Sequence, residues 1–249
     1  MPDAPPHLRG LHGDVAVHAD AGALAAAAAA LLSGASADTC AQTGRFAIAL
    51  SGGATPVAMF ERLARAPYLD GIDWPVWAIY FSDERAVPPD DPASNYHLVH
   101  EHLLSQVPTD PERVHRMPAD ARDLDLAADE YAVRLHGDLD AGPHGAPRLD
   151  CVVLGLGENG HTASLFPGTP ALRVNNRWVT RGTADYAPVD RLTLTYPTIN
   201  AAALVVFLVS GAGKQAALRA TSQATTPAAR IQPVDGRLVW LLDAAAAGV

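Results

Sequence analysis

The sequence predicts an α/β protein built on one doubly wound, mostly parallel sheet with helices on both faces. Short apolar runs rich in β-branched residues recur along the chain, as expected for strands that are buried on both sides. Segments with helical spacing separate most of these runs, which is the order of elements in a parallel sheet. No linker-like stretch interrupts the alternation, so residues 1–249 are expected to form one domain that is loose only at about 1–13 and 244–249.

In the first part of the chain, this pattern predicts three strands separated by helices. Asp20 precedes an alanine-rich run and suits the start of a helix. Thr55 suits an N-cap and Pro56 the first turn of a second helix. The polar stretch 33–43 is expected to be a loop. The expected elements are strands at 14–18, 46–50 and 77–81 and helices at 21–32 and about 57–63.

The remainder of the chain continues the alternation. Ser94 suits the N-cap of a helix that runs through about residue 104, and residues 119–139 carry an apolar face with helical spacing. Another helix is expected to follow Lys214 and to end at about residue 221. The expected strands are 114–117, 151–154, 178–180, 192–196, 203–209 and 238–243.

Length, charge and cysteine content exclude several classes of protein. A chain of 249 residues with 49% hydrophobic residues buries a sufficient core without disulfides or metal. The formal net charge of −9 argues against nucleic-acid binding, although a few local cations would still hold a small anion. Cys40 and Cys151 form no CxxC pair, which fits a reducing cytoplasm. We expect no signal peptide, and the apolar run 21–32 is too short to span a membrane.

Unusual residues follow four of the predicted strands, at 51–55, 83–85, 155–161 and 210–214. The carboxyl ends of parallel strands open on one edge of a sheet, where ligands bind in open α/β folds. The first of these segments, with Ser51, Gly52, Gly53 and Thr55, offers hydroxyl and backbone N–H groups to a phosphate. A tight turn with a capping threonine explains the same residues equally well.

Three cations near these strand ends favour an anionic ligand. Lys214 stands at the start of a predicted helix, where the macrodipole disfavours a cation by a few tenths of a kcal/mol to about 1 kcal/mol. A bound anion would reverse that preference, whereas a solvated surface lysine is the simpler alternative. Arg85 and Arg191 offer further positive charge. The last segment is not a P-loop, because Leu208 stands where the first glycine would be and Gln215 follows the lysine.

The segment 155–160 matches the G-x-G-x-x-G pattern of dinucleotide-binding proteins. We discount that function because the motif lies mid-chain and no acidic residue for a ribose stands near Thr180 and Arg181. An active-site loop that presents His161 to a ligand is the better interpretation.

Two other kinds of site have little support. Three histidines and Glu101 lie close together at 97–102, but their spacing is not that of an HExxH metal site, so a solvated helix face is expected. No G-x-S-x-G nucleophile elbow is present, so a serine-hydrolase mechanism is not expected.

Taken together, these motifs resemble the glucosamine-6-phosphate isomerase/6-phosphogluconolactonase family over residues 14–243. The resemblance rests on SGGATP at 51–56, SDER at 82–85, SNY at 94–96, GLGENGHTASLFP at 155–167, RLTLT at 191–195 and the Gly213-Lys214 pair. In the deaminases of the family, the segment after the histidine resembles AFNEP, whereas this chain has ASLFP, which favours the lactonases. One residue departs from the pattern, since the lactonases commonly have aspartate where this chain has Asn159.

The resemblance implies hydrolysis of 6-phospho-D-glucono-1,5-lactone to 6-phospho-D-gluconate in the oxidative pentose phosphate pathway, in the cytoplasm and without metal or other cofactor. Catalysis would fall to His161 as the general base, with Asp83 orienting sugar hydroxyls or Arg85. The substrate and its phosphate would contact Ser51, Gly52, Gly53, Thr55, Arg85, Asn159, Arg191 and Lys214. A glucosamine-6-phosphate deaminase and a non-catalytic sugar-phosphate-binding module are the alternatives. The expected partner is the small phosphorylated lactone, and a monomer is favoured.

Overall fold

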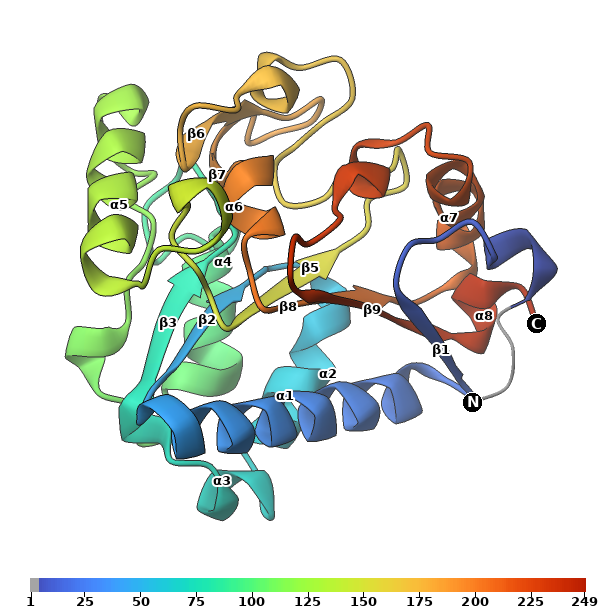
Figure 1. Ribbon diagram of the computed structural model, residues 1–249, viewed down its shortest axis with the longest axis horizontal. Coiled ribbons are helices and arrows are strands. Elements are labelled where there is room, and N and C mark those ends of the chain that lie inside the picture. The colour runs from blue at the N-terminus through green and yellow to red at the C-terminus, as the bar shows by residue number, and fades with distance from the viewer. Residues whose placement is uncertain (1–4) are drawn as a thin grey trace.

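The computed structural model describes residues 5–249, and its centre is a parallel sheet of six strands in the order β1-β9-β8-β5-β2-β3 (Figure 1). Every neighbouring pair is parallel, so the predicted fold class is confirmed. The apolar runs form these strands because both faces of the sheet are covered. The strands are β1 (Asp14–His18), β2 (Phe46–Leu50), β3 (Trp77–Phe81), β5 (Cys151–Gly155), β8 (Leu204–Val209) and β9 (Arg237–Asp243).

The chain leaves the middle of this sheet in two directions. From β2 it continues to the neighbouring edge strand β3, whereas from β5, on the other side of β2, it continues outward to β8 and β9. The adjacent strands β2 and β5 therefore bracket the point where the strand order reverses. In open α/β sheets, the crevice beyond the carboxyl ends of such a pair is the preferred place for a ligand.

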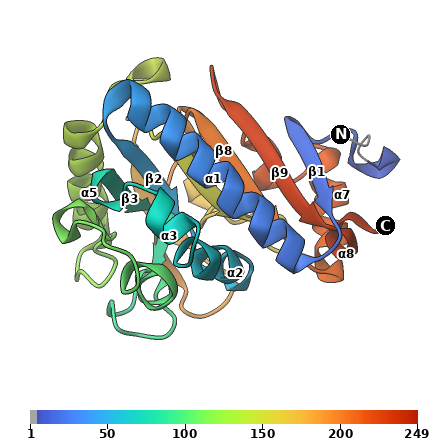
Figure 2. The same cartoon turned by 90° about the horizontal axis from the view of Figure 1, so that it is seen from below.

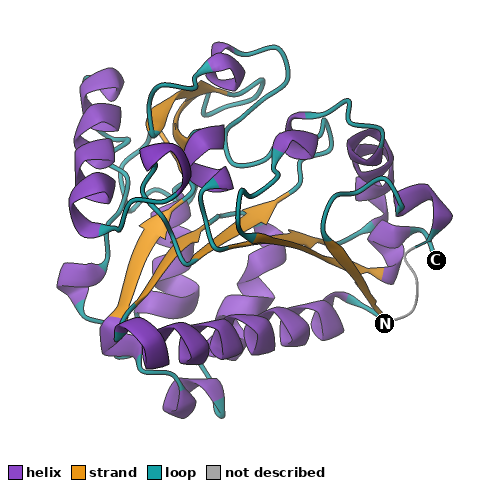
Figure 3. Cartoon of the chain, viewed as in Figure 1, coloured by secondary structure: helices purple, strands orange, loops and turns teal. Residues whose placement is uncertain are grey.

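Helices cover both faces of the sheet, as Figures 1 and 3 show. On one face lie α1 (Ala21–Thr43), α2 (Ala54–Leu63) and the single turn α3 (Tyr68–Gly71), and Figure 2 shows α1 running across the strands. The remaining helices are α4 (Asn95–Val99), α5 (Leu124–Asp138), α6 (Tyr196–Asn200), α7 (Gln215–Ser222) and α8 (Ala244–Ala247).

Helix α1 is longer than the sequence predicts. The expected loop at 33–43 is wrong, because the helix continues to Thr43 and ends at Gly44, whose φ of 74° only glycine adopts easily. Ser36 is tolerated inside it because its hydroxyl accepts a hydrogen bond from the indole of Trp77 at 2.7 Å. The run 21–32 alone was expected to be too short to span a membrane. By length and mean hydropathy, however, the full helix α1 is long and apolar enough to cross one. Its buried face includes Leu24, Ala28 and Leu32, the arrangement of a core helix.

A second, antiparallel sheet in the order β4-β7-β6 was not anticipated. It contains β4 (Asp83–Arg85), β6 (Val179–Thr183) and β7 (Asp190–Leu194). Residues 83–85, which follow the predicted strand 77–81, therefore form a strand of their own. The strands expected at 178–180 and 192–196 belong to this second sheet and do not join the main one. Ser82 links the two sheets, since its N–H donates to Leu50 at 2.9 Å and its carbonyl accepts from Leu194 at 2.8 Å.

Several predicted boundaries shift for local reasons. Ser94 caps α4 as predicted, but a π-helical turn at His100–Leu104 follows that helix. Helix α5 begins only at Leu124, because the carboxylate of Asp123 caps it and a turn precedes it. Between 114 and 117, only Val114 pairs with the sheet, through a single bridge to Ile79, so no strand forms there.

Both ends of the described chain pack against the core, although they were expected to be loose. Leu8 and Leu11 are buried, and β1 pairs with β9 along its whole length. At the other end, Ala246 and Ala247 of α8 are buried. The expectation for residues 1–4 lies outside the described residues.

Candidate active site

One pocket of about 650 Å³ opens beyond the carboxyl ends of β2 and β5, where the strand order reverses. All ten predicted site residues line it, although five separate stretches of sequence supply them. Residues that the sequence reasoning did not select complete its wall, among them Asn95, Ser164, Phe166, Asp185 and Tyr186. The parallel sheet brings together the segments at 51–55, 159–161 and 214, because all its strands end on the same side. Asp83, Arg85 and Arg191 come instead from the second, antiparallel sheet.

A tight glycine turn fixes the backbone around His161. The N–H of Gly157 donates to the carbonyl of His161 at 2.8 Å, and the N–H of Gly160 donates to the carbonyl of Gly157 at 3.0 Å. Gly160 has a φ of 78°, in the left-handed region that favours glycine. The hydroxyl of Thr162 donates back to Gly155 at 2.9 Å, which ties the turn to the end of β5. The turn therefore holds the histidine rigidly at the strand end.

The imidazole of His161 is stacked and hydrogen-bonded on one side. Its ring lies on Phe166, with centroids 4.0 Å apart, and near Tyr186, with centroids 6.3 Å apart. Its Nδ1 is 2.6 Å from Oδ1 of Asn159. Burial lowers the pKa of His161 to about 4, against the attraction of Asp83 and Asp185, so the ring is neutral at neutral pH. A neutral imidazole that lines a pocket is suited to accept a proton.

Asp83 is buried at the start of β4 and is held by hydroxyl groups. Its Oδ2 accepts a hydrogen bond from Ser164 at 2.7 Å, and its Oδ1 accepts from Ser82 at 3.1 Å and from the amide of Asn95 at 3.3 Å. No hydrogen bond joins it to Arg85 among the described residues. The carboxylate therefore has a fixed orientation at the pocket wall, where sugar hydroxyls would be its available partners.

The glycine loop at 51–55 differs from the prediction at its two hydroxyl residues, Ser51 and Thr55. The hydroxyl of Ser51 is buried, donates to the carbonyl of Val153 at 2.8 Å and pairs with Ser82 at 2.6 Å, so it links strands. Thr55 is not the N-cap, because α2 begins at Ala54 with Gly53 as its cap. No side chain caps this helix, so its first N–H groups have no side-chain acceptor, and the residues at its start, Gly53, Ala54 and Thr55, line the pocket.

Gly52 also has a steric requirement. A β-carbon at position 52 would overlap the side-chain amide of Asn95, which donates to the carbonyl of Asp83 at 2.8 Å. The glycine loop and the start of α4 are therefore in close contact. The sequence gives no indication of this contact, because the two segments lie about 40 residues apart.

Two guanidinium groups at the pocket have unpaired N–H donors. Arg191 is only 2% exposed, and within residues 5–249 its Nε and Nη2 have no hydrogen-bond partner, nor has Nε of Arg85. Burial, and then the nearby Arg85, lower the pKa of Arg191. The ring of Tyr186 lies 5.3 Å from the Arg191 guanidinium carbon and gives only partial compensation. Buried donors of this kind are costly unless a ligand satisfies them, and an anion would do so.

Glu84 holds the backbone of two pocket residues, Arg85 and Asn95, without lining the pocket. Its buried carboxylate accepts hydrogen bonds from the backbone N–H groups of Arg85 at 2.7 Å, Asn95 at 2.7 Å and Tyr96 at 2.8 Å, and from the hydroxyl of Ser94 at 3.0 Å. It thus joins β4 to the start of α4. These hydrogen bonds join the motif SDER at 82–85 to the motif SNY at 94–96. The sequence alone did not indicate that the two motifs are in contact.

The loop between β6 and β7 contributes Asp185 and Tyr186, which the sequence analysis did not identify. The carboxylate of Asp185 accepts a hydrogen bond from Nδ2 of Asn159 at 3.0 Å. Lys214, immediately before α7, lines the other side of the pocket, where its charge lowers the pKa of His161. The loop residues have no distinctive spacing in the sequence, so only the packing of the small sheet reveals them.

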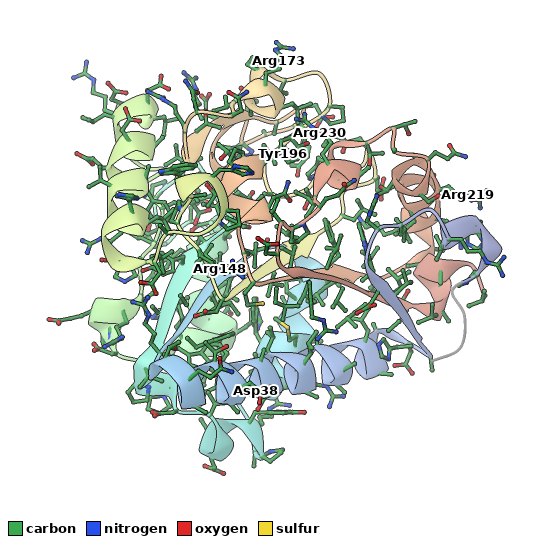
Figure 4. The ribbon with its side chains drawn as sticks, viewed as in Figure 1. Asp38, Arg148, Arg173, Tyr196, Arg219 and Arg230 are labelled. Atoms are coloured by element: carbon green, nitrogen blue, oxygen red, sulfur yellow. The ribbon has the colours of Figure 1, made fainter. Side chains whose placement is uncertain are left out.

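Two further groups of polar residues lie outside this pocket. Within residues 5–249, no three His, Cys, Asp or Glu side chains are placed to hold a metal ion, and His102 of the helical histidine group instead faces Glu61 at 3.3 Å. In Figure 4, Arg230 lies near Tyr196, and its guanidinium carbon is 4.1 Å from the centroid of the tyrosine ring. Arg230 and Tyr196 line a separate cavity and belong to no predicted site.

The fold and the pocket define an α/β protein in which unpaired guanidinium groups lie beside a neutral histidine, an arrangement suited to a small anionic ligand. The family model described as glucosamine-6-phosphate isomerases/6-phosphogluconolactonase matches residues 19–240. The chain therefore belongs to the glucosamine-6-phosphate isomerase/6-phosphogluconolactonase family.

Named relatives and a solved structure agree with this assignment. A 6-phosphogluconolactonase of Synechocystis sp. is 43% identical over 209 residues, 82% of this chain and 84% of that protein. One of Nostoc sp. is 41% identical over 210 residues, 82% of this chain and 85% of that protein. The structure of 6-phosphogluconolactonase from Trypanosoma brucei superposes with a TM-score of 0.84 at 28% identity, covering 96% of this chain and 98% of that one.

Proposed function

We propose that this protein hydrolyses 6-phospho-D-glucono-1,5-lactone to 6-phospho-D-gluconate, the second step of the oxidative pentose phosphate pathway. The main support for the proposal is that the neutral imidazole of His161 and the unpaired guanidinium of Arg191 line the same pocket. The first supplies a base and the second an anion-binding group, which a phosphorylated lactone requires together. The names of the relatives point to the same reaction.

In the proposed mechanism, Nε2 of His161 takes a proton from the water that attacks C1 of the lactone. Nδ1 already contacts Oδ1 of Asn159 at 2.6 Å, so Nε2 is the ring nitrogen available to the water. The imidazolium then returns the proton to the ring oxygen as the C1–O bond breaks. A lactone is an activated ester, so one base and a positioned water suffice. The guanidinium of Arg85 or backbone N–H groups at the strand ends would stabilise the oxyanion.

The 6-phosphate would be held by Arg191, Lys214 and the uncapped N–H groups at the start of α2. A phosphate held in this way would orient C1 toward His161. The hydrolysis would then be a reaction of a bound, aligned ester. Ser51 supports the pocket through its internal hydrogen bonds, and Asp83 would bind the sugar hydroxyls.

Turnover of freshly generated lactone, measured against a buffer blank because the lactone also hydrolyses spontaneously, tests this function. We expect His161→Ala to reduce turnover by about 10² or more without changing the circular dichroism spectrum. Near-normal turnover by this variant would reject His161 as the base. Ammonia release from glucosamine 6-phosphate would instead identify a deaminase, and binding of 6-phosphogluconate without any turnover would identify a sugar-phosphate sensor.

We also propose that the enzyme acts in the cytoplasm and as a monomer. Both cysteines are free, and Cys151 is buried in β5, which is typical of proteins from reducing compartments. The acidic net charge of −9 is unsuited to nucleic-acid binding. Cell fractionation and size-exclusion chromatography with light scattering would test these two statements.

A further inference from the structure

A chain of hydrogen bonds leads from Asp185 through Asn159 to the imidazole of His161. Oδ2 of Asp185 accepts from Nδ2 of Asn159 at 3.0 Å, and Oδ1 of Asn159 lies 2.6 Å from Nδ1 of the ring. The three residues come from two parts of the chain, because Asp185 belongs to the β6–β7 loop and the other two belong to the glycine turn after β5. The loop of the second sheet, between β6 and β7, thus places the carboxylate of Asp185 next to Asn159.

The partners of Asn159 determine which way its amide points. A carboxylate only accepts hydrogen bonds, so the Nδ2 side must face Asp185. A backbone N–H only donates, and that of His161 contacts Oδ1 at 3.1 Å. Both contacts therefore direct Oδ1 toward the ring, so the hydrogen of the neutral imidazole must reside on Nδ1. This tautomer leaves the lone pair of Nε2 free to accept a proton.

We propose that Asp185 is a positioning residue for His161 that acts through the amide of Asn159. The proposal rests on the proposed function, in which His161 is the base. As the ring gains a proton, the Nδ1–H bond to Oδ1 becomes charge-assisted, and Asp185 strengthens it by polarising the amide. Asn159 alone brings no charge to the ring, so the carboxylate that stabilises the imidazolium is supplied from the neighbouring loop.

Other charged groups also face His161. Asp83 from β4 favours its protonated form, whereas Lys214 before α7 and Arg191 from β7 disfavour it. Among the described residues, none of these three hydrogen-bonds to the ring or to the amide of Asn159, and the carboxylate of Asp83 is held by hydroxyl groups instead. Asp185 differs from them because it is hydrogen-bonded to the group that holds Nδ1.

A set of four proteins tests the proposal: wild type, Asp185→Asn, Asn159→Asp and the double variant. In the wild-type background, Asp185→Asn should reduce kcat about tenfold with little change in KM. In the Asn159→Asp background, the two carboxylates would repel each other, so adding Asp185→Asn should leave kcat unchanged or raise it. Equal losses in both backgrounds, or no loss in the first, would overturn the proposal.

Nitrogen NMR of the His161 ring gives a readout that does not depend on turnover. We expect the Nδ1–H tautomer in the wild type and a mixture of both tautomers in Asp185→Asn; an unchanged tautomer in the variant would contradict the proposal. Asp190→Asn is the matched control, because Asp190 borders the same loop but pairs with the exposed Arg181 at 2.5 Å. If the wild type fails to hydrolyse lactone, the proposed function fails, and the tautomer still reports on Asp185.

Discussion

The imidazole of His161 occupies the space in which a β-carbon on Gly157 would stand. The two residues also share a backbone hydrogen bond, from the N–H of Gly157 to the carbonyl of His161 at 2.8 Å. The glycine turn therefore does more than connect β5 to the following segment. It leaves room for the ring to fold back over the backbone, with Phe166 on its face and Asn159 at Nδ1.

Gly157→Ala should consequently impair catalysis more than folding. The added methyl group would push the ring out of its stacked position, and we expect kcat to fall by about 10², as for a misplaced catalytic group. Lactone turnover and thermal unfolding should be measured together. Gly34→Ala, a helical glycine with open space around its β-position, is the control and should retain full turnover. Normal kcat in Gly157→Ala would show that the ring position is not critical.

The acid side of the pH–rate profile should lie unusually low. Burial lowers the pKa of His161 to about 4, and a base must be unprotonated, so turnover should stay constant from neutral pH to about 5 and be halved near 4. The phosphate of the substrate itself titrates near pH 6, so NMR titration of the His161 ring without ligand is the control. A ring pKa near 6.5 would contradict the buried environment.

The same pKa links stability to pH. An unfolded chain has a histidine pKa of about 6.5, so between about pH 4 and 6.5 the unfolded state binds more protons at this residue. Its contribution to the free energy of unfolding therefore rises with pH across that window and is lost as the pH falls toward 4. His161→Gln should flatten this part of the stability curve in urea unfolding experiments, and an identical curve would argue against the shift.

Replacing Arg191 should weaken substrate binding while stabilising the free protein. Its guanidinium is buried with two unpaired nitrogens, so Arg191→Met should raise KM at least tenfold and increase stability by about 1 to 3 kcal/mol, a few degrees in Tm. Addition of 6-phosphogluconate should raise the Tm of the wild type but not of the variant. Arg181→Met, on the neighbouring strand but exposed, is the control. A lower Tm for Arg191→Met would show that the guanidinium is satisfied in the free protein.

Lys214→Ala should increase KM for the phosphorylated lactone and leave kcat nearly unchanged, because a pocket lysine that holds the phosphate would do so equally in the ground and transition states. Its loss should also allow the pKa of His161 to rise slightly, since its charge lowers that pKa. Steady-state kinetics at two salt concentrations would measure the effect, because an electrostatic contribution weakens in salt. An unchanged KM would remove Lys214 from the phosphate site.

The fold class and the edge of the sheet at which the pocket opens were both predictable from local sequence. The buried strands are continuous apolar runs, and each run that borders the pocket ends in glycine or polar residues, so parallel pairing had to gather His161, Lys214 and the glycine loop at one edge. Helix boundaries were less predictable. Residues 33–43 contain polar side chains that suggest a loop, yet packing against the sheet and the Ser36–Trp77 hydrogen bond keep them helical.

The sequence by itself determined that a histidine follows a glycine turn at a strand end and that cations stand at neighbouring strand ends, because such features depend on residues adjacent in the chain. Only the tertiary structure decided which groups hold the side chain of Asn159. Its partner Asp185 lies 26 residues away in the loop of a separate antiparallel sheet, and the position of that loop follows from strand pairing and the bridging hydrogen bonds of Ser82. These interactions join segments distant in sequence, so no local pattern encodes them.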